Sequence, residues 1–109
     1  MAKSKYKAMW LLAMFDLPTK TRRSRQRYTR FRKHLLDEGF HMMQYSVYAR
    51  YCETAVKAHK FRRKIQTNLP PDGEVRLISI TDVQFGQMEV FLGKKRTTTE
   101  SAPPQLLLF

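Results

Sequence analysis

Asp16 is the residue whose chemical type and position in this sequence most suggest a reactive site. It lies in the stretch Met-Trp-Leu-Leu-Ala-Met-Phe-Asp-Leu-Pro at 9–18, where it directly follows seven apolar residues. A continuous apolar run this short, ended by Asp16 and Pro18, predicts a strand buried on both faces rather than a helix. A carboxylate at the end of a central strand could bind a divalent cation, but it could equally be only the polar end of the strand. Position alone slightly favours the second interpretation.

A magnesium site at Asp16 would need a second carboxylate. Mg²⁺ is usually held by one or two carboxylates together with waters or phosphates, so a single Asp binds it weakly. A two-fold dimer could supply the missing ligand, because an isologous interface can place the same residue opposite itself. Two carboxylates brought close without a cation would repel each other. If Asp16 is a metal ligand, we therefore expect Mg²⁺ to be shared by two Asp16 side chains across a homodimer.

Other chemistry receives less support from the sequence. The three histidines, His34, His41 and His59, lack the spacing of metal ligands. Cys52 is the single cysteine, which excludes an internal disulfide and a cysteine-based zinc site, and we interpret it as a packed residue rather than a nucleophile. Four isolated glycines form no phosphate-binding loop. No aromatic RNA-recognition motif is present, so we interpret four tyrosines as core or interface residues: Tyr6, Tyr45, Tyr48 and Tyr51.

The elements that position Asp16 follow from the apolar periodicity and the turn residues. Helical spacing of apolar residues predicts helices over 19–38, closed by Gly39, and over about 53–68. The order β-α-β-β-α-β is that of an α+β, ferredoxin-like sandwich, here followed by an additional C-terminal strand. The predicted strands are at 9–16, on both sides of a bend near 44–46, at 74–81 and at 88–92, with a connection over 82–87.

This order of elements predicts which polar residues lie near Asp16. In the antiparallel sheet of such folds the first and third strands are central, so the end of the first strand lies beside the bend between the second and third. Asp16 should therefore face Gln44, Tyr45 and Ser46. Asp82 ends a strand that runs antiparallel to the first. We expect it at the far edge of the sheet, where it cannot form a site with Asp16 in one chain.

The sequence is strongly basic. Lys and Arg number 21 and Asp and Glu number 9, which gives a net charge of +12. With 42% apolar and 12% aromatic residues the chain should fold, so we expect a folded basic domain with a polyanionic partner. No acidic residue occurs between Asp16 and Asp37, whereas solvated helix faces normally mix signs. We therefore favour phosphate-binding faces over ordinary solvated faces at Arg22, Arg23, Arg25, Arg30, Arg32, Lys33, Lys60, Arg63 and Lys64.

Composition divides the chain into a domain over 1–93, a polar linker over 94–104 and a terminal apolar segment over 105–109. Exposed apolar residues favour aggregation, so we expect this segment to pair with a sheet edge of its own domain or of another chain. No apolar run approaches the ~20 residues of a membrane span or has the pattern of a signal peptide, so we expect a soluble cytoplasmic protein that binds no membrane. The predicted partner-binding residues are Gln105, Leu106, Leu107, Leu108 and Phe109.

Several of these residues together resemble the CRISPR-associated Cas2 family. The similarity covers about 9–93, and its most specific part is the Gln-Tyr-Ser-Val-Tyr element at 44–48, which follows an aspartate at the end of the first strand. The other matching parts are Phe-Asp-Leu-Pro at 15–18, Gly-Phe at 39–40, Ile-Thr-Asp at 80–82 and Gln-Phe at 84–85.

The resemblance implies a ferredoxin-like homodimer that joins the Cas1 integrase in a complex capturing new spacer DNA. In that complex the Cas2 dimer is the central bridge and contacts the backbone of the double-stranded prespacer, while the integrase carries the strand-transfer sites. Family members are also described as metal-dependent nucleases on RNA or DNA, with the strand-one aspartate as Mg²⁺ ligand, a role that transfers to Asp16. C-terminal segments of the family add to a sheet edge or dock on the integrase. The resemblance implies the same role for residues 105–109.

Two hypotheses of different classes follow. The first is a double-stranded DNA-binding scaffold for spacer acquisition, in which the basic helices bind phosphates without reading sequence. The second is a Mg²⁺-dependent endonuclease that cleaves phosphodiester bonds of RNA or DNA through Asp16 paired across the dimer. Its weakness is the lack of other acids or bases nearby, with Tyr45 and Ser46 the only local candidates. We favour the scaffold as the physiological role.

Overall fold

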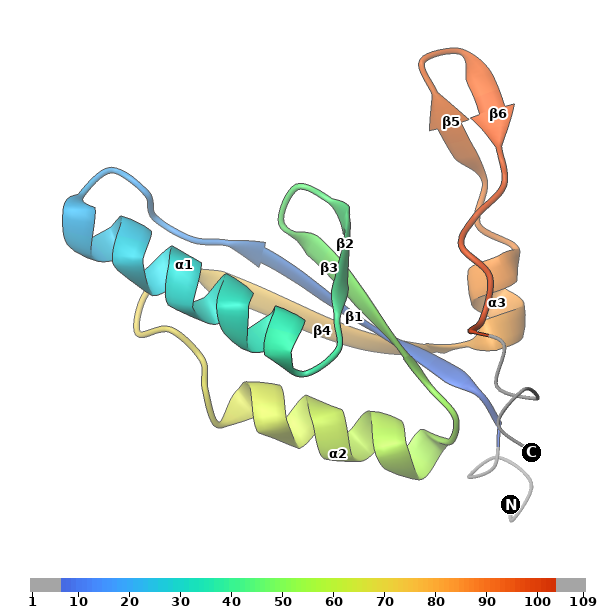
Figure 1. Ribbon diagram of the computed structural model, residues 1–109, viewed down its shortest axis with the longest axis horizontal. Coiled ribbons are helices and arrows are strands. Elements are labelled where there is room, and N and C mark those ends of the chain that lie inside the picture. Colours follow the sequence, from blue (N-terminus) through green and yellow to red (C-terminus); the bar gives the residue numbers. More distant parts are fainter. Residues whose placement is uncertain (1–6, 104–109) are drawn as a thin grey trace.

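The structure, a computed structural model, describes residues 7–103 and has the α+β, ferredoxin-like fold that the sequence predicts. Antiparallel strands form one sheet in the order β2-β3-β1-β4, and α1 and α2 both lie on one face of it (Figure 1). The elements are β1 (Met9–Asp16), α1 (Arg22–Asp37), β2 (His41–Gln44), β3 (Val47–Cys52), α2 (Ala55–Gln66), β4 (Glu74–Thr81), α3 (Asp82–Gly86), β5 (Val90–Leu92) and β6 (Lys95–Thr97).

β1 is central in the sheet and is buried on both faces, as predicted. It pairs with β3 on one side and with β4 on the other. Leu11 and Ala13 pack toward the helices, Trp10 and Leu12 pack on the opposite face, and all four are buried. Because successive side chains of a strand point to opposite faces, Asp16 continues the row of Trp10 and Leu12 on the face without α1 and α2.

The core between the sheet and the helices follows the predicted apolar stripes in part. Phe31 and Leu35 of α1 and Ala58 and Ile65 of α2 are buried there. Leu69 continues the helical spacing of Ala58, Phe61 and Ile65 in the sequence and would be expected on the same buried stripe, but it lies beyond α2 and is exposed, because the helix already ends at Gln66.

Local signals fix both ends of α1. The Thr21 hydroxyl accepts a hydrogen bond from the Ser24 N–H at 3.0 Å, and the Ser24 hydroxyl accepts one from the Thr21 N–H at 2.9 Å, which forms a capping box. Gly39 follows the helix with a φ of 88°, a left-handed conformation that glycine adopts without the steric cost of a Cβ. The predicted helix end at Gly39 is confirmed, and the chain turns there into β2.

The segment 40–51 forms two strands joined by a tight turn, as predicted. β2 ends at Gln44 and β3 begins at Val47, with Ser46 in the turn at a φ of 63°. The Ser46 carbonyl accepts a hydrogen bond from the Phe15 N–H at 3.0 Å, so the turn is fixed beside the end of β1. The expectation that Asp16 lies next to this bend is confirmed.

The segment 82–87, predicted as a connection, contains the short helix α3. Thr81 is its N-cap, and Thr81 and Gln84 exchange hydrogen bonds in a second capping box. The prediction missed the helix because only one apolar residue, Phe85, anchors it to the core. The Phe85 ring stacks on Trp10 with centroids 3.9 Å apart and an interplanar angle of 8°.

The additional C-terminal strand is confirmed, but it does not join the main sheet within the described residues. β5 pairs with β6 in a separate two-stranded sheet, joined by a turn at Gly93, and this hairpin stands away from the four-stranded sheet (Figure 1). β6 therefore lies inside the range 94–104 that composition indicates to be a polar linker. The terminal segment 105–109 lies outside the described residues.

Candidate functional site

Asp16 is an exposed carboxylate at the end of a buried strand. No hydrogen bond or ion pair joins its side chain to another residue within 7–103. Its neighbour across the sheet is Glu74, whose carboxylate accepts a hydrogen bond from Arg76 Nε at 3.0 Å. The fold therefore positions Asp16 through its backbone and leaves its carboxylate available for a ligand.

A hollow of about 640 Å³ opens beside Asp16, between the end of β1, the start of α1 and the turn before β4. Its wall includes the cationic side chains of Lys20 and Arg23. A second carboxylate in the wall, Asp72, accepts a hydrogen bond from Arg27 Nη1 at 2.8 Å and is thereby neutralised. The lining of the hollow thus combines one acidic residue without a described partner with cationic residues, a composition suited to a phosphate bound next to a metal.

The residues of one chain do not complete a metal site. Within 7–103 no group of three or more His, Cys, Asp or Glu side chains is placed to hold a metal ion. Asp16 can serve as one oxygen ligand, whereas both nearby carboxylates are engaged by arginines. A magnesium ion fits here only where another molecule supplies further oxygen ligands.

Asp82 lies at the opposite end of the sheet, as predicted, and its surroundings assign it a structural role. Its N–H donates to the Ala8 carbonyl at 3.0 Å, beside the start of β1. Its carboxylate Oδ1 accepts a hydrogen bond from Trp10 Nε1 at 2.7 Å. Asp82 also lies in the first turn of α3, where a negative charge is favourable.

The six predicted phosphate-binding residues of α1 are all exposed. Two of them have partners: Arg25 Nη1 donates to the carbonyls of Thr19 and Lys20 at 3.2 and 3.3 Å, and Lys33 pairs with Asp37 at 2.9 Å. The other four make no hydrogen bond or ion pair with any described residue: Arg22, Arg23, Arg30 and Arg32. These four, which we call the free arginines, are the most available cations of the helix.

The predicted basic residues of α2 differ in whether they have an ionic partner within the chain. Lys60 and Arg63 are exposed and have no ionic partner within the described residues. Lys64 instead joins α2 to α1, because its Nζ pairs with Glu38 at 3.3 Å and lies 5.2 Å from the Phe61 ring centroid. Lys64 therefore contributes mainly to helix packing.

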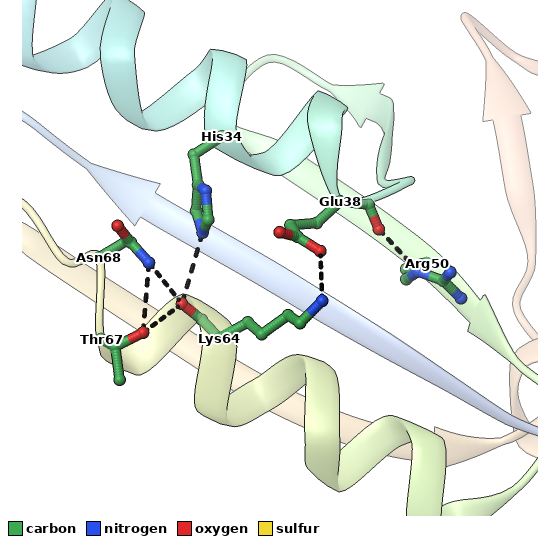
Figure 2. A network of polar contacts seen from close by, with 6 residues as sticks. All are labelled: His34, Glu38, Arg50, Lys64, Thr67 and Asn68. Carbon is green, nitrogen blue, oxygen red and sulfur yellow. Dashed lines mark hydrogen bonds and ion pairs between the residues drawn. The ribbon is translucent and has the colours of Figure 1, made fainter.

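Figure 2 shows that this junction extends through the backbone. The Lys64 carbonyl accepts hydrogen bonds from Thr67 Oγ1 at 2.9 Å and Asn68 Nδ2 at 3.0 Å, and it lies 3.4 Å from His34 Nε2. The Glu38 carbonyl accepts a hydrogen bond from Arg50 Nε at 2.7 Å. Part of the positive charge in the sequence thus holds α1, α2 and β3 together.

The tyrosines separate into different environments. Tyr48 is fully buried and Tyr51 is half-buried, in agreement with the prediction of core residues. Tyr45 is 75% exposed, so it is not part of the core of this chain, and the interface alternative for it stays a prediction. Its position in the turn is the signal that could have indicated exposure, because a residue at a hairpin tip cannot reach the core of its own sheet.

Tyr45 is nevertheless held in place by α1. Its ring stacks on that of Tyr28, with centroids 6.2 Å apart and an interplanar angle of 20°. The hydrogen-bonding interaction with Tyr28, more than any other cause, raises the pKa of Tyr45 above its ordinary value, so the phenol is protonated at neutral pH. The Tyr28 hydroxyl also lies 3.4 Å from Ser46 Oγ.

Cys52 is buried, as its interpretation as a packed residue requires. Burial raises the pKa of its thiol, which keeps it protonated at neutral pH. A protonated, buried thiol is a poor nucleophile.

The fold and the exposed cations define a class of protein: a small ferredoxin-like domain whose first helix carries exposed guanidinium groups without partners among the described residues. The sequence profile of the family described as CRISPR associated protein Cas2 matches residues 9–88. The chain therefore belongs to the Cas2 family.

Curated relatives support this assignment over nearly the whole chain. A protein of Parvibaculum lavamentivorans is 52% identical over 93% of this chain and 100% of its own length. A protein of Flavobacterium psychrophilum is 44% identical over 97% of this chain and 92% of its own length. Both are named CRISPR-associated endoribonuclease Cas2. None of the helices within 7–103 is long and apolar enough to cross a bilayer.

Proposed function

We propose that this chain is the DNA-binding bridge of a CRISPR spacer-acquisition complex, in which it works as a homodimer with the Cas1 integrase. The observation that carries the proposal is the set of free arginines on α1. A guanidinium group without a protein partner is available for a phosphate, and several on one helix suit the backbone of a double-stranded prespacer. Such contacts position DNA without reading its sequence.

The homodimer is supported by the sheet face that α1 and α2 leave open. Leu12 is buried there, but Ile78, its register partner on β4, is 47% exposed. Met14 lies between Leu12 and Asp16 on the same face. An apolar face of this kind favours packing against a second copy, which would bring a second Asp16 to the same interface.

Salt dependence tests the DNA-binding role. We expect duplex affinity, measured by fluorescence anisotropy, to fall steeply between about 50 mM and about 200 mM salt. Replacing Arg30 by Gln should reduce the slope of log K against log salt by about 0.9, the contribution of one phosphate contact. Arg62→Gln is the matched control, because it removes the same charge from a guanidinium that donates to Ser79 Oγ at 2.7 Å. Duplex affinity that does not depend on salt would contradict the proposal.

A second candidate function, metal-dependent cleavage of RNA or DNA, is favoured by the unpaired carboxylate of Asp16. Magnesium, when bound, would activate water and polarise a phosphoryl oxygen. In this role Asp16 would hold the metal together with the Asp16 of a second copy, and Lys20 and Arg23 would bind substrate phosphates. The names of the curated relatives agree with an RNA substrate.

The two candidates separate in one experiment on Asp16→Ala, after light scattering has shown that wild type and variant have the same oligomeric state. Normal spacer integration by the reconstituted complex together with lost cleavage would assign Asp16 to the nuclease alone. Failed integration with duplex binding retained would give Asp16 a direct part in acquisition. Unchanged cleavage by the variant would contradict the nuclease candidate and indicate a contaminating enzyme.

The terminal residues 105–109 remain the proposed partner-binding segment. Their sequence is apolar, and the sheet has an edge strand, β4, that pairs on one side only within the described residues. An added strand at such an edge gains main-chain hydrogen bonds. Removal of 105–109 should therefore weaken association with a second copy or with the integrase, as measured by light scattering of each mixture.

A further inference from the structure

We propose that Tyr45 is a stacking platform for an unpaired nucleobase, so that the Asp16 end of the sheet takes a single-stranded segment of nucleic acid. The inference rests on the proposed function, because it assumes that the chain binds nucleic acid. The inference goes beyond the proposed function because it specifies an unpaired strand as the ligand and names the residue that selects this strand.

The first observation is the position of the ring. Tyr45 occupies the tip of the β2–β3 turn and is 75% exposed, more than Phe91 at 54%. One face of the ring rests on Tyr28, which itself packs on Phe15 with centroids 5.8 Å apart. The ring is thus supported from the core outward, and its other face is open to solvent.

The second observation is the charge on the helix that supports the ring. Arg32 follows Tyr28 by one helical turn, so the two side chains lie on the same side of α1. Arg32 is exposed and has no ionic partner among the described residues. Proteins bind single strands by combining stacking aromatic rings with cations that bind phosphates, and α1 offers such a cation on the side that supports Tyr45.

The third observation is the short path to Asp16. The residue after Tyr45, Ser46, accepts a hydrogen bond from the N–H of Phe15, the residue before Asp16. The turn that carries Tyr45 is therefore fixed beside the end of β1, although the Asp16 side chain lies on the other face of the sheet from α1, on which the Tyr45 ring rests. Bases inside a duplex are stacked on one another, so the ring can reach only an unpaired base, in a single strand or at a frayed or overhanging end.

A nucleobase explains these features better than a protein partner does. On a protein-docking surface, an exposed aromatic ring is normally part of a contiguous apolar patch. The turn residues on both sides of Tyr45 are the polar Gln44 and Ser46, and the helix beneath the ring carries the free arginines. The phenol is neutral at neutral pH, so it adds no repulsion toward a phosphate.

The test compares short single-stranded RNA and DNA with a blunt duplex by fluorescence anisotropy at one salt concentration, on the full chain. Tyr45→Ala should weaken binding of the single strands about 5- to 150-fold, the usual effect of losing one base-stacking ring. It should leave duplex binding unchanged. Tyr45→Phe should keep wild-type affinity for both, because stacking needs the ring and not the hydroxyl. Met42→Ala is the matched control, since it removes another exposed apolar side chain from the same hairpin.

The outcomes separate the two proposals. Wild-type protein that binds the duplex with steep salt dependence, but whose Tyr45→Ala variant binds single strands normally, would overturn this inference alone. Equal losses for single strands and duplex would overturn it as well. If Tyr45→Ala changes self-association in light scattering and not strand affinity, the ring is a protein contact and the inference fails. Crosslinking of a 5-iodouracil oligonucleotide to Tyr45, located by mass spectrometry, would support it independently.

Discussion

Asp16 and Asp82 are both aspartates that end an apolar strand, yet the fold uses them in opposite ways. The Asp82 carboxylate accepts a hydrogen bond from Trp10 and lies in the first turn of α3. The Asp16 carboxylate is exposed and joins no described residue. At one end of the sheet the charge is part of the structure, and at the other it has no partner among the described residues.

The same contrast applies to the buried polar groups near the two ends. The Trp10 N–H is satisfied by Asp82, within a stack of Trp10 on Phe85. The Tyr48 hydroxyl, on β3 close to the turn beside Asp16, is buried without a hydrogen-bond partner among the described residues. The difference teaches that the buried polar group at the Asp82 end is paired within the chain, whereas the Tyr48 hydroxyl near the Asp16 end has no partner among the described residues.

The largest expected effect is at the Asp82 end. Phe85→Ala should lower the free energy of unfolding by about 3 to 5 kcal/mol, because it removes a fully buried ring and leaves a cavity beside Trp10. Urea denaturation followed by circular dichroism would measure the loss. A loss no greater than that of an exposed control, Phe91→Ala, would show that α3 does not anchor this end of the sheet.

Asp82→Ala should lower the free energy of unfolding by about 1.5 to 3 kcal/mol, since it leaves the Trp10 N–H without its charged acceptor. Adding Trp10→Phe to this variant removes the donor as well, and the double-mutant cycle gives the coupling energy of the pair. A coupling energy of zero would contradict the distinction between the two aspartates, because the Asp82 carboxylate would then contribute no more to stability through Trp10 than the unpartnered Asp16 carboxylate does.

Tyr48→Phe should raise the free energy of unfolding by about 1 kcal/mol, because it removes a buried hydroxyl that has no partner within 7–103 while keeping the ring. Thermal unfolding monitored by circular dichroism is the measurement. Tyr51→Phe serves as the control, since the Tyr51 ring is only half-buried. Destabilisation by Tyr48→Phe would mean that the hydroxyl has a partner in the working protein.

The smallest stability effect is expected for Asp16→Ala, within about 0.5 kcal/mol of wild type, as for exposed positions without partners. Under the proposed nuclease function its effect should appear in metal-dependent cleavage instead, as a loss of activity with unfolding unchanged. A stability loss similar to that of Asp82→Ala would show that the two carboxylates have the same structural role. That result would remove the main distinction between the two ends.

The sequence by itself determined the elements whose signals are local. β1 follows from one apolar run, α1 from a periodic stripe closed by Gly39, and β4 from an apolar segment after a turn. The placement of Asp16 beside the β2–β3 turn also followed, because the order of elements fixes the antiparallel sheet. These features depend on neighbours in the sequence or on topology, so patterns in the chain are enough to predict them.

Only the tertiary structure decided which polar groups are free. Trp10 meets Asp82 from 72 positions away in the sequence, and Lys64 meets Glu38 from 26 positions away. No pattern of spacing distinguishes Asp82 from Asp16 or Lys64 from Lys60, since both aspartates follow an apolar run in the sequence and both lysines lie on α2. Tyr45 likewise became a candidate only when its ring was found exposed on Tyr28. The physical reason is that a charge or a ring becomes available for a ligand only when the fold gives it no partner, and partners are set by long-range packing.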